Sequence, residues 1–224
     1  KGYDQLILDG GTPSSLSASL SKEMLAGQMS SYSNLNFLPP IALDAVIILP
    51  RDHWINANVI HSVGASDADG DVVLYSINAG NPDADKDGSA AFSVNSQGNV
   101  LVEDSDELGN LSNGLATLEV RLSDGKGLFG SVTVTVKIGN ALALGSSAIE
   151  GTDKWWNSAW LGNFFSDKSS WVYHEHLGWL YVSPAQATGY WLWSASQTSW
   201  LWTSSETYPY LYKDSVGWLY LRTE

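Results

Sequence analysis

The sequence predicts an all-β protein with two parts: a β-sandwich over residues 37–140 and a module of β-hairpins over residues 155–224. Three observations lead to this prediction. Short apolar segments alternate with polar residues between Gly, Asp and Asn turns, as in antiparallel strands. Two Asp-rich turns interrupt the first run of strands. Ten of the eleven Trp follow residue 154, so the composition changes between the two parts.

The net charge of −13 argues against two classes of partner. Nucleic acid and anionic membrane surfaces are both bound through basic patches, which this composition does not favour. The sequence contains no Cys, so disulfides do not stabilise the fold, although this does not decide the compartment. Its longest apolar stretch, Ile41 to Leu49, is far too short to span a bilayer and contains Asp44.

Residues 1–36 are expected to be a lead-in segment. Leu16, Leu20, Met24 and Leu25 recur at helical spacing, which predicts one short amphipathic helix between Ser15 and Ser30. No chemistry is evident in this segment.

Seven strands are expected between residues 37 and 140. Segments such as 118–122 and 132–138 alternate apolar and polar residues, which places the apolar side chains on one face. Seven short strands in about 100 residues are typical of an antiparallel sandwich. The expected strands are Ile41–Leu49, Asn58–Val63, Val72–Ile77, Ala91–Val94, Val100–Val102, Leu115–Leu122 and Ser131–Ile138.

The acidic turns are the candidate metal sites. The first carries Asp67, Asp69 and Asp71, and the second carries Asp83, Asp85 and Asp87. Calcium takes about six to eight oxygen ligands, and alternate residues of a tight loop can direct several carboxylates at one centre. Two solvated turns are the alternative, since Asp and Gly are common in turns. Two such clusters within one short span favour calcium.

Three segments, residues 65–71 ahead of Tyr75, residues 92–98 and residues 118–125, together resemble a cadherin-type domain of bacterial surface proteins. The resemblance covers residues 36–140 and implies an Ig-like or cadherin-like sandwich with calcium at a domain junction. It also implies a secreted or cell-surface location, in a bacterium. The ligands that it implies are Asp67, Asp69 and Asp124, Asp52 in place of a Glu, and the pair Asp106 and Glu107.

This sequence departs from that family in two respects. Residues 83–88 form an addition that resembles a thrombospondin-type-3 or dockerin-like calcium loop, but Val94 holds the position of an EF-hand's closing carboxylate. Only one such domain is present, whereas the family places its metal between domains. The run Glu103–Glu107 is either a ligand loop or a solvated acidic edge.

Residues 141–154 are small and mixed in polarity, which predicts a linker. Beyond them, residues 171–182 match residues 210–221 as an internal repeat, with two further aromatic strands between. Such aromatic hairpins are similar to modules at the C-termini of large secreted bacterial proteins, and more distantly to aromatic wall-binding repeats.

Each strand of this module alternates aromatic and aliphatic residues, so its two faces differ. Either the aromatics form the core or they form an exposed band that binds a partner. Packing of most aromatics against each other and the sandwich is the favoured alternative. The aromatic face comprises Trp171, Tyr173, Trp179, Tyr181, Trp191, Trp193, Trp200, Trp202, Tyr210, Tyr212, Trp218 and Tyr220.

His174 and His176 form a possible metal pair, but their position in a turn predicts solvated loop residues. No sequence motif of a Cys or Ser nucleophile, a zinc protease or a phosphate loop is present. We therefore expect a non-enzymatic, extracellular, calcium-binding adhesion protein whose aromatic module engages a protein or glycan. A self-assembling filament subunit and a carbohydrate-binding appendage of a larger enzyme are the alternatives.

Overall fold

The structure is a computed structural model, and it describes residues 38–185 and 188–222. The expected lead-in segment over residues 1–36, with its short helix, lies outside the described residues. The all-β fold class is confirmed, because strands dominate both parts of the described chain. No described helix is long and apolar enough to cross a bilayer.

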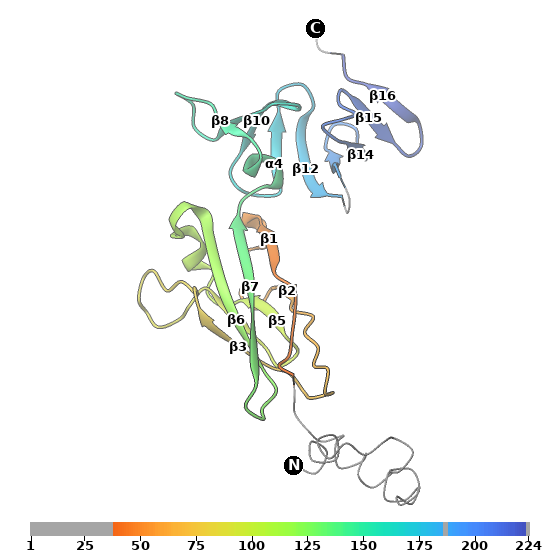
Figure 1. Cartoon of the computed structure of the whole chain (residues 1–224). Coiled ribbons are helices and arrows are strands. Elements are labelled where there is room, and N and C mark those ends of the chain that lie inside the picture. The colour runs from red at the N-terminus through yellow and green to blue at the C-terminus, as the bar shows by residue number, and fades with distance from the viewer. Residues whose placement is uncertain (1–37, 186–187, 223–224) are drawn as a thin grey trace, which may run out of the picture.

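The first part is a β-sandwich of two sheets (Figure 1). One sheet has the strand order β1-β7-β6-β3, in which β1 is parallel to β7, and the other has the order β2-β5-β4. All seven expected strands are present within a few residues of their predicted bounds. They are β1 (Ala45–Leu49), β2 (Val59–Ser62), β3 (Leu74–Ala79), β4 (Phe92–Val94), β5 (Asn99–Val102), β6 (Leu115–Ser123) and β7 (Phe129–Ile138).

Alternation along the strands builds the sandwich core. Leu118, Val120 and Leu122 of β6 are fully buried, whereas Glu119 and Arg121 between them are exposed. The same alternation buries every second residue of β7, and both sheets contribute to one apolar cluster. Burial of these aliphatic side chains is the main favourable term in forming the sandwich.

Strand β1 begins later than expected. Its ladder starts at the pair Ala45↔Val134, and Ile41 makes only an isolated bridge with Ser66. The ladder does not extend further because the amide of Thr133 donates to the Asp44 side chain at 2.8 Å and not to a backbone carbonyl of β1. The remaining short helices of the sandwich are η1 (Arg51–His53), η2 (Asp106–Gly109) and η3 (Ser112–Gly114).

The stretch expected to be a linker contributes to the second part. It contains helix α4 (Ala141–Leu144) and strand β8 (Ser147–Ala148). The Asn140 side chain caps α4 by accepting from the Leu142 amide at 2.9 Å. Leu142 and Ala143 are buried in the core of the module, so α4 packs against that core.

The aromatic module is a single antiparallel sheet whose nine strands follow one another in chain order. Four consecutive hairpins make up eight of these strands, in agreement with the expected meander. The strands after β8 are β9 (Trp155–Ser158), β10 (Gly162–Ser166), β11 (Trp171–His174), β12 (Gly178–Pro184), β13 (Tyr190–Ser194), β14 (Ser199–Thr203), β15 (Tyr210–Lys213) and β16 (Gly217–Tyr220).

This sheet curls strongly about one face. Trp160 lies in the turn before β10, and Tyr190 begins β13, three strands away. In a flat sheet three strand spacings span about 14 Å. The two rings nevertheless stack with centroids 5.9 Å apart, and Trp160 also meets Tyr208 at 5.8 Å. The sheet therefore encloses a core without a second sheet facing it.

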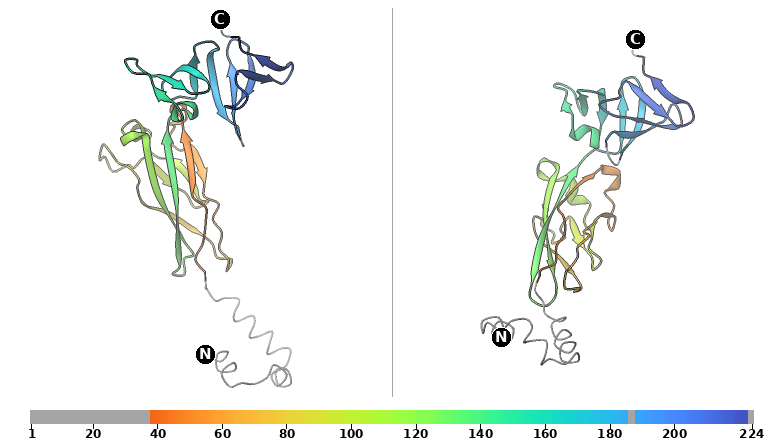
Figure 2. Two further views of the ribbon diagram at one scale, coloured as in Figure 1. Left: turned by 45° about the horizontal axis from the view of Figure 1, so that its top comes forward. Right: turned by 45° about the vertical axis from the view of Figure 1, so that its right-hand side comes forward.

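The two parts lie end to end, with α4 at their junction (Figures 1 and 2). Hydrogen bonds connect the sandwich to the turn between β10 and β11. Asp52 accepts from the Ser170 amide at 2.8 Å, the Arg51 amide donates to the Lys168 carbonyl at 2.9 Å, and Asn140 donates to the Ser169 carbonyl at 2.9 Å. These contacts fix the end of the sandwich that carries η1 against the module.

Candidate functional site

The first acidic turn lies between β2 and β3 and is held by its own carboxylates. Asp67 Oδ1 accepts from the amides of Asp69 at 2.8 Å and Asp71 at 3.3 Å, and Gly70 adopts a positive φ of 81° within the turn. Asp69 Oδ2 accepts from the Leu38 amide. The Oδ2 atoms of Asp67 and Asp71 are buried without a protein hydrogen-bond partner.

Asp124 and Lys126 complete this end of the sandwich. Asp124 lies in the β6–β7 hairpin, is buried, and accepts through Oδ1 from three successive amides, the nearest that of Lys126 at 2.7 Å. The Lys126 ammonium pairs with Asp71. That hydrogen bond, with the charges of Asp71, Asp124 and Asp67, raises the pKa of Lys126. A cation of the chain itself therefore already lies among these carboxylates.

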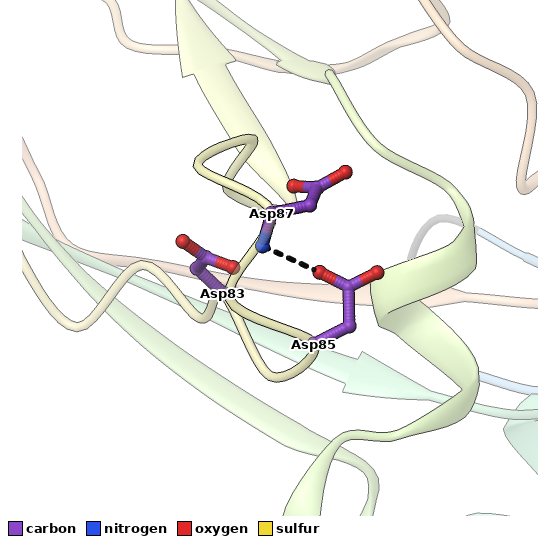
Figure 3. A group of neighbouring side chains, drawn as sticks. All are labelled: Asp83, Asp85 and Asp87. Atoms are coloured by element: carbon purple, nitrogen blue, oxygen red, sulfur yellow. Dashed lines mark hydrogen bonds between the residues drawn. The ribbon is translucent and has the colours of Figure 1, made fainter.

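The second acidic turn, between β3 and β4, forms a more compact group (Figure 3). One oxygen from each of Asp83, Asp85 and Asp87 lies within 4.8 Å of the other two. Calcium–oxygen distances of 2.3–2.6 Å place two ligands of one ion at most about 5 Å apart, so these oxygens fit a single ion. In the described part of the chain, no other group of three His, Asp or Glu meets this distance.

Hydrogen bonds shape the second turn. The Asp87 amide donates to Asp85 Oδ1 at 3.0 Å, and the Ser89 amide donates to Asp87 Oδ1 at 2.7 Å. Gly88 has a positive φ of 95° where the loop turns back. Asp83 Oδ1 is buried without a hydrogen-bond partner, which leaves a carboxylate oxygen to be satisfied by a cation.

Glu107 anchors this turn from behind. It is completely buried in η2, and its carboxylate accepts from the amides of Ala84 and Asp85. Because its oxygens accept from those amides, Glu107 positions the turn, and it does not belong to the compact group of Asp83, Asp85 and Asp87. Asp106, its predicted companion, is exposed, and its amide donates to Asp104. The structure does not bring Asp106 and Glu107 together with the first acidic turn.

Asp52 lies at the opposite end of the sandwich from Asp67, Asp69 and Asp124. Asp124 precedes the start of β7, whereas Asp52 follows β1, whose last residue pairs with Ile138 at the end of β7. Nine strand steps of about 3.3 Å separate these ends by about 30 Å. The expected grouping of Asp52 with the other three at one ion is therefore wrong, and Asp52 instead accepts from Ser170 of the module.

The aliphatic face of the module is the core, and the aromatic face is exposed. Val172, Leu180, Leu192, Leu201 and Leu211 are buried. Eight of the twelve outward aromatic rings keep between 36% and 62% of their surface in solvent. The favoured expectation, that most aromatics pack against each other and the sandwich, is met only in part, because the rings contact each other but eight of them are exposed. The exposed members are Trp171, Tyr173, Trp179, Trp191, Trp200, Tyr210, Trp218 and Tyr220, and those between them are half-buried.

Edge-to-face contacts join these rings into one surface. Cross-strand partners such as Tyr173 and Trp179 have centroids 5.5 Å apart, and Trp193 and Trp200 are 5.7 Å apart. Diagonal contacts link one hairpin to the next, including that of Tyr181 with Trp200 at 6.3 Å. The rings thus stiffen one another while leaving a broad amphipathic surface exposed.

His174 is not the solvated loop residue that its position predicted. Its ring is completely buried, with Nε2 hydrogen-bonded to the Leu161 carbonyl at 2.8 Å and Nδ1 accepting from the amides of His176 and Leu177. Burial lowers the pKa of His174. Since both ring nitrogens have partners, His174 and His176 do not form a metal pair.

Sequence reasoning overlooked three residues. Lys126 lies in the same hairpin as Asp124, and its charge within an acidic cluster was the available signal. Trp160 fixes the curvature of the module but lies outside the strand repeat. Trp156 faces inward, opposite Phe164, and its indole nitrogen is buried without a partner. Because neighbouring residues of a strand point to opposite faces, the only available signal was that Trp155 and Trp156 cannot both face outward.

Comparison with known proteins shows only distant likenesses. No family model and no curated protein matches the chain. Drosophila N-cadherin EC1-4 aligns with 45% of this chain and 24% of its own at 17% identity and a TM-score of 0.38. Mouse protocadherin-24 EC1-3 aligns with 46% of this chain and 34% of its own, at 20% identity and a TM-score of 0.38.

The protocadherin gammaB7 EC3-6 cis-dimer structure aligns with 53% of this chain and 29% of its own, again at 20% identity and a TM-score of 0.38. The chain therefore spans about a quarter to a third of the length of these three structures.

Proposed function

We propose that this chain is a non-enzymatic, extracellular binding protein of the adhesion type. In this proposal calcium stiffens the sandwich, and the aromatic module engages a partner on a cell surface. The partner is a protein, a glycan or a second copy of the chain.

The outward aromatic face carries this proposal. Monomeric soluble proteins rarely expose contiguous apolar patches above a few hundred Å². Here the exposed rings span hairpins from β11 to β16, and Trp218 alone is 54% exposed. Indole and phenol groups supply both flat apolar surface and hydrogen-bond donors, a combination enriched at interfaces. A module that needs only its aliphatic face for folding leaves this aromatic face available for binding.

The second acidic turn supports the calcium part of the proposal. Asp83, Asp85 and Asp87 would hold the ion, with Glu107 fixing their backbone from behind. A bound ion would offset the mutual repulsion of three carboxylates and restrain the loop between β3 and β4. Extracellular calcium-binding modules work with dissociation constants near 10⁻⁴–10⁻³ M, and the proposed location would require an affinity no tighter than this range.

Binding through the aromatic face can be measured with the whole chain on beads. Coated beads are mixed with one another and with a panel of insoluble polysaccharides, in calcium. We expect clustering or retention that falls at least about fivefold when Trp200 is replaced by Gln. Leu43→Gln is the matched control, because Leu43 is a large apolar residue on the sandwich that is 89% exposed. The proposal is contradicted if neither clustering nor retention is observed. It is also contradicted if Trp200→Gln and Leu43→Gln weaken them equally.

One observation favours self-assembly as a second candidate function. Strand β1 forms an edge of its sheet, and Val46 and Ile48 project from it into solvent. An apolar edge strand is a template for pairing with another chain. Filaments or oligomers in negative-stain images, lost in Val46→Lys, support this candidate. A strict monomer in calcium at high protein concentration contradicts it.

A further inference from the structure

A cavity of about 470 Å³ lies at the junction of the two parts. Arg51 and Trp54 line it from the sandwich, and Lys154, Trp156, Asp167 and Lys168 line it from the module. This volume is within the range of small-ligand sites, about 300–1,000 Å³. The cavity is separate from both acidic turns, and its inward-facing Trp156 lies across the sheet from the exposed aromatic face.

The cavity concentrates positive charge in an acidic chain. Of the eleven Lys and Arg in the sequence, nine lie in the described residues, and three of these nine line this one cavity. Its carboxylates, Asp153 and Asp167, leave a local excess of one positive charge. Arg51 Nη1 lies 3.8 Å from Asp167 Oδ2, and both side chains are partly in solvent. Such an exposed ion pair is weak, so the guanidinium can also pair with a ligand.

Hydrogen bonds fix the backbone from which these cationic side chains extend. Lys154 and Lys168 both adopt left-handed conformations, with φ of 61° and 76°. The carbonyl of Lys154 accepts from the Ser166 amide, and the carbonyl of Lys168 accepts from the Arg51 amide, each at 2.9 Å. The three cationic residues are therefore anchored to one hydrogen-bonded frame that joins the sandwich to the module.

Trp156 supplies an unused donor. Its Nε1 is buried and has no acceptor among the described protein groups, and the residue lines the cavity, so a ligand oxygen reaches this N–H when the indole turns toward the cavity. A buried donor without a partner destabilises the fold. Such a cost is offset when a ligand oxygen accepts the hydrogen bond. Trp54 and Trp156 also contribute apolar indole surface to the lining of the cavity.

We propose that this junction cavity binds an acidic saccharide, a sugar carrying a carboxylate. The carboxylate pairs with the Lys154, Lys168 and Arg51 side chains, a sugar oxygen accepts from the Trp156 indole, and sugar hydroxyls donate to Asp153 and Asp167. The C–H faces of the sugar ring lie against the two indoles. Since the cavity has walls from both parts, bound ligand holds the sandwich and the module together.

Titration calorimetry on the whole chain, in low salt with chelator, tests this site. The probe is a galacturonic acid trisaccharide, and its control is the same trisaccharide with each carboxylate reduced to an alcohol. We expect the acidic form to bind at least about tenfold more tightly, with an affinity that falls as salt is added. Equal binding of the two sugars, or no binding of the acidic one, overturns the proposal.

Variants locate the binding. Trp156→Phe keeps one aromatic ring but removes the N–H, and it should weaken binding about five- to tenfold. Lys168→Gln should weaken binding by a similar factor and flatten its salt dependence. Lys137→Gln, which removes an exposed charge from β7, and Trp200→Gln, on the aromatic face, should leave binding unchanged. Unchanged binding in both Trp156→Phe and Lys168→Gln overturns the proposal.

A direct signal comes from the unmodified chain. The indole N–H resonance that is missing in Trp156→Phe identifies Trp156, and it should shift when the acidic trisaccharide is added. A resonance that stays in place while heat of binding is measured overturns the assignment to this cavity. Because Trp200→Gln and Lys168→Gln affect different sites, failure here is distinguishable from failure of the aromatic face.

Discussion

Replacing Leu192 by Ala opens a cavity at the centre of the aromatic module's core. Leu192 lies on β13, is completely buried, and belongs to the cluster that the curled sheet encloses. Leu→Ala changes at such positions cost about 2–5 kcal/mol, since transfer free energy and cavity formation add. The central position of Leu192 and the tight curl of the sheet limit collapse, so we expect about 3 kcal/mol.

Tyr220→Ala is the matched change on the other face. Tyr220 is 62% exposed on the edge strand β16, and its main ring contact is with Tyr210 at 5.2 Å. An aromatic pair of this kind is worth about 0.5–1.5 kcal/mol beyond burial of area. We therefore expect a loss of about 1 kcal/mol, a third of the loss at Leu192.

Thermal unfolding followed by Trp emission measures this difference, because ten of the eleven Trp report on the module. For a unit of about 70 residues, 1 kcal/mol shifts the melting temperature by about 4–8 °C. Leu192→Ala should therefore lower it by about 15 °C, and Tyr220→Ala by about 5 °C. Equal shifts, or a larger shift for Tyr220→Ala, would refute the assignment of the aliphatic face to the core.

Two further predictions concern the backbone and pH. Gly80→Ala should lower the free energy of unfolding, measured with denaturant, by more than about 3 kcal/mol, because the new Cβ would lie 1.7 Å from the Thr117 carbonyl oxygen. Gly70→Ala is the control, since Gly70 has a similar φ but no atom within 4 Å of the new Cβ, and it should cost about 1–2 kcal/mol. Similar costs for the two variants would contradict the close packing at Gly80. Burial lowers the pKa of His174 below its ordinary value of 6.5, so His174 binds fewer protons in the folded state than in the unfolded state. The contribution of neutral His174 to the stability of the module should therefore be complete above pH 6.5 and be lost as the pH falls through the folded pKa. His174→Asn should reduce that slope of melting temperature against pH, and an unchanged slope excludes His174 as its source.

Strands of the sandwich could be predicted from sequence because each buries only one face. In β6 and β7 a period of two separates Leu and Val from charged or hydroxyl residues, and this pattern determines which face of each strand is buried. Asp44 shows where the pattern is insufficient. Its side chain replaces a backbone partner for Thr133, and that contact, 89 residues apart in the chain, decides where β1 begins.

The module shows a different limit of prediction. Both faces of its strands are apolar, so the period of two separates aromatic from aliphatic residues without saying which are buried. Curvature decides the question, because the inner side of a curled sheet has less room than its outer side. Val and Leu fill most of the interior together with Phe164, and the rings of the repeat strands lie outside. The contact of Trp160 with Tyr190, which fixes that curl, joins residues that no strand pattern relates.

A compact group of carboxylates could be predicted only where its members are close in sequence. Asp83, Asp85 and Asp87 are close in sequence, and the loop brings their oxygens together as the spacing indicates. Asp52 and Glu107 depend instead on which end of the sandwich they occupy and on which amides face them. Their hydrogen bonds to Ser170 and to Ala84 and Asp85 arise from tertiary packing, which carboxylate spacing does not encode.

Scanning calorimetry with calcium and with chelator tests the central claim most directly. At a hundredfold excess over its dissociation constant, an ion that binds only the native state stabilises it by about 2.7 kcal/mol. For a sandwich of about 100 residues this predicts a rise of roughly 10–20 °C in its melting temperature. The rise should be lost in Asp85→Asn and kept in Asp52→Asn, because Asp52 faces the module. A transition that calcium does not move, or that moves equally in Asp85→Asn, would contradict a calcium-stiffened sandwich.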